Sequence, residues 1–128
     1  MSKFIISFGA NAMDHIAEEE MPAVADSAHT VVQEILNAGA YVVAGGLENR
    51  SASIVDTDGT ISDGHEPEAI GGFTIVDVSS REAALEWAAK IAVACRCAQE
   101  VWKISDDPTL DSMLQQTSRH MRRPNEKR

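Results

Sequence analysis

The fold is decided by residues 71–91, which read GGFTIVDVSSREAALEWAAKI. Residues 73–78 are β-prone and apolar on both faces for most of their length, so they predict a strand with a buried centre. Ser79 and Glu82 have the spacing of a capping box and predict that a helix starts directly after this strand. The buried face of this helix is predicted from apolar residues that recur at helical spacing, namely Ala84, Trp87, Ala88 and Ile91.

A similar strand and helix are predicted near the N-terminus. Residues 4–8 form an apolar, β-prone run, and Pro22 suits the first turn of a helix that Gly39 caps at its C-terminal end. Residues 41–44 then predict a second strand. The buried face of the first helix is predicted at helical spacing from Val24, Ala28, Val31 and Ile35.

A hairpin, a last strand and a short helix complete the predicted elements. Residues 53–56 and 60–62 flank Asp58-Gly59, a dipeptide that two-residue hairpin turns prefer because both central positions need positive φ. The last strand lies within residues 98–104, and residues 110–116 predict a short helix.

The order of these elements predicts an α+β protein with a ferredoxin-like, split β-α-β fold and an extra hairpin strand. Residues 1–105 form this single domain, and residues 106–128 form a short C-terminal helix followed by a basic, disordered tail. Both helices are expected to cover one face of the sheet. Phe8, Ile75 and Trp102 are too apolar for all of them to face water on the other side, so we expect a homodimer or a higher homo-oligomer.

Charge and composition narrow the possible partners. The formal net charge is −9, and because residues 119–128 carry +4, the rest of the chain carries −13. Such an acidic body repels nucleic acids and anionic membranes, so neither is expected as a partner. No apolar run has the length of a membrane span or a signal peptide, and Cys95 and Cys97 predict no disulfide framework. The chain is therefore expected to be cytoplasmic.

Several of these stretches resemble the YCII-related family, one branch of which is named after the motif Asp-Gly-Pro-Phe. The similarity extends over about residues 3–105 and rests on His29 and on residues 39–47, 61–66, 71–78 and 82–88. This resemblance implies a ferredoxin-like, dimeric α/β barrel. It also implies chemistry near lactone hydrolysis and dehalogenation of ring-cleavage products.

The resemblance further implies a cleft near the sheet in which a histidine and an aspartate act as a pair. The matching positions in this chain are His29 and Asp63. The chain departs from the motif directly after Asp63-Gly64, where His65-Glu66 replaces Pro-Phe.

The sequence supports two classes of function. In the first, His29 is a catalytic general base, oriented by Asp63, that acts on water or an acidic C–H of a carboxylate- or lactone-like substrate. In the second, the chain is a non-catalytic dimeric module that binds a small organic ligand or has a regulatory role. If the two residues do not form a pair, both are expected to have structural roles. His29 would then hydrogen-bond a backbone carbonyl or water, and Asp63 would accept hydrogen bonds from loop N–H groups in an Asp-Gly turn.

No cofactor and no metal ion is predicted. A divalent metal would need four scattered side chains, those of His15, His29, Asp63 and His65. Their spacing matches no metal signature. Glu66 and Glu68 are candidate acid or base groups, but an acidic loop is usually solvated. The glycine pairs at 45–46 and 71–72 lack the Gly-x-Gly-x-x-Gly pattern of phosphate-binding loops and are interpreted as strand ends.

Overall fold

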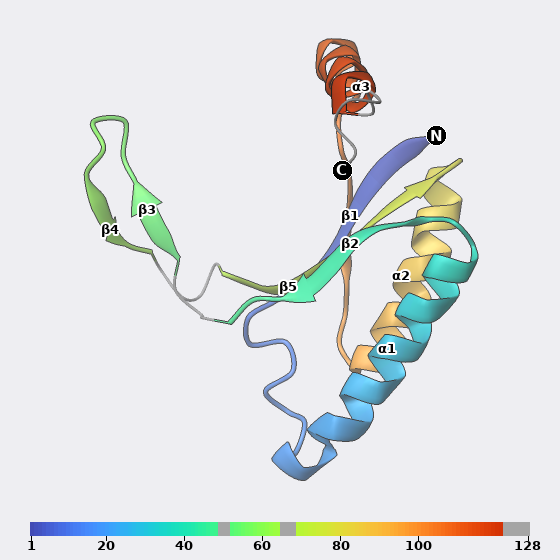
Figure 1. Ribbon diagram of the computed structural model, residues 1–128. Coiled ribbons are helices and arrows are strands. Elements are labelled where there is room, and N and C mark those ends of the chain that lie inside the picture. The colour runs from blue at the N-terminus through green and yellow to red at the C-terminus, as the bar shows by residue number, and fades with distance from the viewer. Residues whose placement is uncertain (49–51, 65–68, 122–128) are drawn as a thin grey trace.

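The computed structural model describes residues 1–48, 52–64 and 69–121. It confirms the predicted α+β class, and Figure 1 shows the two long helices on the same side of the sheet. The elements follow in the order β1 (Ser2–Gly9), η1 (Glu18–Glu20), α1 (Met21–Asn37), β2 (Tyr41–Gly46), β3 (Ser53–Val55), β4 (Ile61–Asp63), β5 (Ile70–Val78), α2 (Arg81–Cys95), β6 (Glu100–Lys103) and α3 (Pro108–Met121).

The main sheet has four strands in the order β2-β5-β1-β6. All three neighbouring pairs are antiparallel, and β1 and β5 lie at the centre. Each central strand leads through one helix to an edge strand, α1 joining β1 to β2 and α2 joining β5 to β6. This arrangement is compatible with the predicted ferredoxin-like fold.

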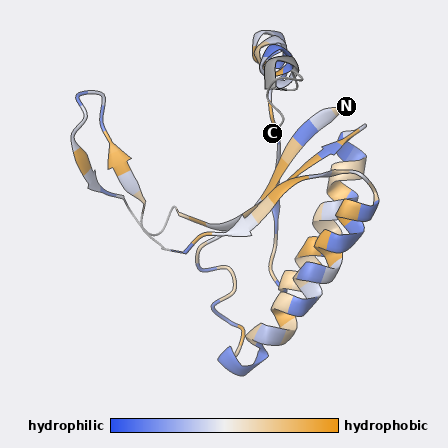
Figure 2. Cartoon of the chain, in the orientation of Figure 1, coloured by the Kyte–Doolittle hydropathy of each residue, from blue (hydrophilic) through white to orange (hydrophobic). Residues whose placement is uncertain are grey.

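The core lies between the sheet and the two long helices. Side chains alternate between the faces of a strand, so Phe4 and Ile6 of β1 point to the helices together with Val76 of β5. The predicted apolar faces of both helices are confirmed, because their members are buried or packed against this cluster. Figure 2 shows the same distribution, with apolar residues along the strands and the sheet-facing sides of the helices.

The helix ends follow local chemistry, with one correction to the predicted start of α2. The helix begins after Ser80, whose Oγ accepts a hydrogen bond from the Ala83 N–H at 3.1 Å. The predicted cap at Ser79 is therefore wrong by one residue, because either of two adjacent serines could fill the N-cap position. At the end of α1, Gly39 has a φ of +74°, which confirms its predicted capping role.

The hairpin β3–β4 forms, but it does not join the main sheet. Its two strands pair only with each other among the described residues, and Figure 1 shows them projecting away from the helices. The turn also differs from the prediction, because Asp56 and Thr60 close a three-residue loop in which Gly59 alone has positive φ. One αL glycine after a β-turn is the usual form of such a loop.

The C-terminal helix α3 is longer than predicted and starts earlier. The Asp107 carboxylate accepts a hydrogen bond from the Leu110 N–H at 3.0 Å, and Pro108 occupies the first helical turn. Asp107 and Pro108 thus set the start of α3, and they lie before residues 110–116, whose apolar pattern was the basis of the prediction. The side chains of residues 108–118 are exposed, and the predicted basic tail beyond residue 121 lies outside the described residues.

One of the three residues predicted to face away from the helices lies on the other side. Phe8 is in phase with Phe4 and Ile6, so its ring points to the helix side of the sheet. Ile75 and Trp102 both pair with Ile5, which places them together on the open face. Trp102 is 61% exposed there.

Candidate functional site

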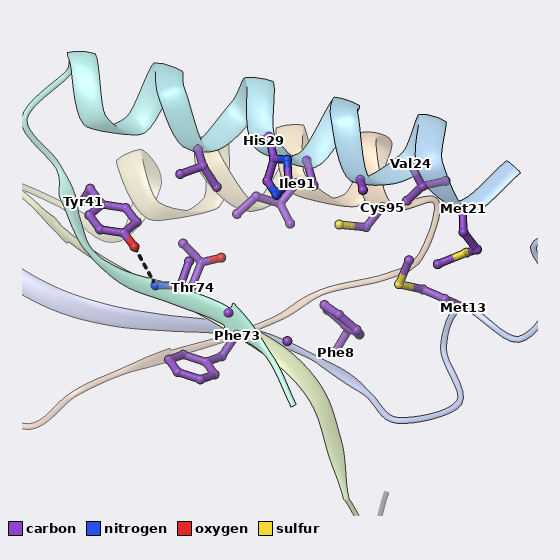
Figure 3. A pocket seen from close by; sticks show the side chains of 16 residues that line it. Phe8, Met13, Met21, Val24, His29, Tyr41, Phe73, Thr74, Ile91 and Cys95 are labelled. Atoms are coloured by element: carbon purple, nitrogen blue, oxygen red, sulfur yellow. Dashed lines mark hydrogen bonds between the residues drawn. The ribbon is translucent and has the colours of Figure 1, made fainter. Parts of the chain in front are cut away.

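A cavity of about 490 Å³ lies between α1 and the sheet. Its size is typical of small-molecule sites, and most of its wall is apolar. Figure 3 shows α1 along one side of the cavity and the strands along the other. Phe8 closes it from β1, and Ile91 and Cys95 contribute from α2.

His29 lies at this cavity, as part of a row of α1 that is distinct from the core row. The core row contains Val24, Val31 and Ile35, all buried. His29 shares its side of the helix with Ala25 and Val32, which also line the cavity. Figure 3 shows the imidazole pointing from α1 toward the sheet. His29 was predicted at the border of the buried face of α1, and in the structure this border forms part of the cavity wall.

Two hydroxyl groups of the sheet face the same cavity. Tyr41 begins β2, and its Oη accepts a hydrogen bond from the Ala44 N–H at 3.1 Å. The phenolic proton therefore remains available to a ligand. Thr74 of β5 is almost fully buried and pairs with Ala44 in the sheet register. The cavity wall thus combines an imidazole with two hydroxyl groups, and none of the described residues that line it is a carboxylate, a lysine or an arginine.

Asp63, the predicted partner of His29, lies elsewhere in the chain. It is the last residue of β4, is exposed, and pairs with Ser53 in the hairpin. It does not line the cavity. The hairpin projects away from the helices, so a single chain does not bring Asp63 to the cavity that His29 lines (Figure 1). His65 lies outside the described residues.

A second hollow has a volume of about 680 Å³ and adjoins Phe8. Its wall contains the side chains of His15, Cys97 and Glu100, and Phe8 lines both hollows. Within the described ranges, no group of three or more His, Cys, Asp or Glu side chains could hold a metal ion. Nor does any helix there have the length and apolarity needed to cross a membrane.

The two cysteines are not activated nucleophiles. Burial raises the pKa of Cys95, and the nearby Cys97 raises this pKa further. Burial also raises the pKa of Cys97, with a smaller opposing effect from a hydrogen bond that Gln99 donates to its sulfur. A thiol with a raised pKa is mostly protonated near neutral pH, so it reacts slowly. Cys95 therefore contributes packing surface to the cavity wall.

Phe8, Tyr41 and Thr74 line the cavity although they were not predicted as site residues. The alternation of β1 is a local signal that could have placed Phe8 on the helix side. Tyr41 and Thr74 meet only because β2 pairs with β5, and no local pattern encodes that register.

The chain matches no model of a known protein family, and it matches no curated protein. The function is therefore inferred from the cavity and its wall.

Proposed function

We propose that this protein is a homodimeric, cytoplasmic small-molecule-binding protein whose ligand site is the cavity between α1 and the sheet. The observation that carries the proposal is a cavity of about 490 Å³ with mostly apolar walls, at which His29, Tyr41 and Thr74 present polar groups. A few convergent polar groups in an apolar hollow are the usual composition of a ligand site. The free thiols of Cys95 and Cys97 suit a reducing compartment.

A non-catalytic role is favoured over an enzyme because no carboxylate of the described residues lines the cavity beside His29. A general base is usually oriented by such a group, which also stabilises the charge that the imidazole acquires. The enzyme alternative needs Asp63 from a second copy. The observation that favours it is the position of Asp63 on a hairpin that projects from its own chain.

The homodimer is supported by apolar surface on the side of the molecule that the helices leave open. Val43 and Trp102 are exposed on the sheet, and in the hairpin Val55 and Ile61 are 65% and 69% exposed. Figure 2 shows an apolar segment in each hairpin strand, although the hairpin projects from the body. A two-stranded hairpin is marginally stable in water, so contact with a second copy would stabilise it. Packing of two sheets in this way would give the dimeric α/β barrel implied by the resemblance to the YCII-related family.

The proposed site is tested with the fluorescent probe 8-anilinonaphthalene-1-sulfonate and two tryptophan substitutions on α1. Ala25 and Ala23 are both exposed on α1, but of the two only Ala25 lines the cavity. Ala25→Trp should fill part of the cavity and abolish saturable probe binding, and Ala23→Trp should bind the probe like the wild type. Equal binding by both variants, with unchanged thermal unfolding, would show that the probe does not use this cavity. Sedimentation at micromolar concentration tests the homodimer, and a monomer would contradict it.

A further inference from the structure

The cavity is polar at one end and apolar at the other. Figure 3 shows His29, Tyr41 and Thr74 along one part of it, while Met13, Met21 and Phe8 lie around the opposite part. Methionine side chains are flexible and adapt to apolar groups of different shape. This division fits a ligand with one polar head group and an apolar tail.

The polar end favours a head group that accepts hydrogen bonds. His29 can donate from its ring, Tyr41 can donate because its oxygen already accepts the Ala44 N–H, and Thr74 carries a hydroxyl. No Asp or Glu side chain is present among the described residues that line the cavity, so a cationic head group would have no opposite charge beside it there. An ammonium group accepts no hydrogen bond, which disfavours an amine at donors of this kind. A carboxylate accepts hydrogen bonds at both oxygens and is the stronger acceptor because it is charged.

The apolar end is closed by Phe8. The ring of Phe8 packs against the backbone of β5, where a Cβ on Gly72 would lie 2.7 Å from the ring atom Cζ. Glycine at this position therefore allows the ring to lie flat against the strand. Among the described lining residues, Phe8 is the one that the cavity shares with the second hollow. A ring in this position would limit the length of a ligand tail.

We propose that the cavity binds a small apolar monocarboxylate, with the carboxylate at His29, Tyr41 and Thr74 and the tail directed toward Phe8. This inference rests on the proposed function, because it names the ligand class of the same site. Phe8 sets the longest tail that the site accepts.

The test compares three probes with the same tail, octanoate, octanol and octylammonium, by isothermal titration calorimetry on the full chain. Octanoate should bind at least about tenfold more tightly than octylammonium, as expected for one charge-assisted hydrogen bond. His29→Gln keeps a hydrogen-bond donor and removes the imidazole ring. This variant should lose about tenfold in octanoate affinity and change octanol affinity by less than about twofold.

A chain-length series tests the role of Phe8. In the wild type, affinity should rise by about fourfold per methylene from hexanoate upward and then stop rising once the tail reaches Phe8. In Phe8→Ala the rise should continue to dodecanoate, because the tail can enter the second hollow. The same limit in both proteins would overturn the role of Phe8.

The outcomes separate the ligand class from the proposed function. Equal or tighter binding of octylammonium or octanol, competing with 8-anilinonaphthalene-1-sulfonate in the cavity, would overturn the carboxylate class and leave the binding function standing. Failure of all three probes and of the fluorescent probe to bind would overturn both. Because Phe8→Ala could lower stability, binding is measured only where its circular dichroism spectrum matches the wild type.

Discussion

Replacing Gly72 with alanine should destabilise the protein by about 1–2 kcal/mol, because the new methyl group meets the ring of Phe8. The Cβ would lie 2.7 Å from Cζ and 2.9 Å from Cε2 of that ring, and 3.2 Å from the carbonyl oxygen of Gly45. Carbon atoms normally pack at about 3.5–4.0 Å, so the ring must move by about 1 Å. Overpacking of this kind costs about 1–3 kcal/mol, and the lower chain entropy of alanine offsets about 0.4–1 kcal/mol.

A double-mutant cycle tests whether Phe8 is the cause. Removing the ring in Phe8→Ala should relieve most of the clash, so the double variant should lose less stability than the sum of the single variants by about 1 kcal/mol or more. Gly71→Ala provides a matched comparison. A Cβ on Gly71 would lie 2.9 Å from the ring but also 2.9 Å from the backbone oxygen of Gly9, and the second contact remains after the ring is removed. Phe8→Ala should therefore rescue Gly71→Ala much less.

Urea unfolding, followed by circular dichroism, provides the free energies for this cycle. Gly45→Ala is the control, because a Cβ at Gly45 would have nothing within 4 Å. This variant should stay within about 0.5 kcal/mol of the wild type. If Gly72→Ala were as stable as Gly45→Ala, or if Phe8→Ala gave the two clashing variants the same relief, Phe8 would not lie where the structure places it. The proposed limit that Phe8 sets on the ligand tail would then fail.

Other predictions concern the core, a helix cap and the thiols. Ile35→Ala should lower the unfolding free energy in urea by about 2–5 kcal/mol because the side chain is fully buried, and a loss under about 1 kcal/mol would contradict this packing. Ser80→Ala should cost about 1 kcal/mol in the same assay through loss of the α2 cap, whereas no change would argue against the hydrogen bond to Ala83. Iodoacetamide at pH 8 should alkylate Cys95 and Cys97 more slowly than it alkylates the thiol of glutathione, since burial raises the pKa of both cysteines. The alkylation rate should rise with pH as the thiolate forms. Alkylation as fast as that of glutathione would refute the buried placement.

The elements and their order could be predicted because they depend on local periodicity. The apolar, β-prone run of β5 and the helical spacing in α1 and α2 are visible in short windows, and the buried positions Ile35 and Ala84 follow from the helical spacing. The start of α2 was missed by one residue because Ser79 and Ser80 are chemically equivalent as caps. The wrong side was assigned to Phe8 because its apolar character was considered without its phase relative to Ile6.

The cavity could be predicted only in part, because its wall depends on contacts between distant segments. The position of His29 beside the buried row of α1 follows from helical spacing and proved informative. The meeting of Tyr41 with Thr74 depends on the pairing of β2 with β5, and the separation of Asp63 from His29 depends on the hairpin standing apart from the main sheet. The local sequence of a strand does not determine its register with a distant strand such as that of β2 with β5. It also does not determine the direction in which a hairpin projects.

The most direct test of the ligand site is an NMR titration of the histidine side chains with octanoate, using protein labelled with ¹⁵N-histidine. His29 lines the proposed site and His15 lines the second hollow, so His15 serves as an internal control. Octanoate should cause a saturable shift of the His29 resonances, with little change at His15. Saturable binding of octanoate that leaves His29 unmoved, or that shifts His15 instead, would contradict the assignment of the cavity between α1 and the sheet as the ligand site.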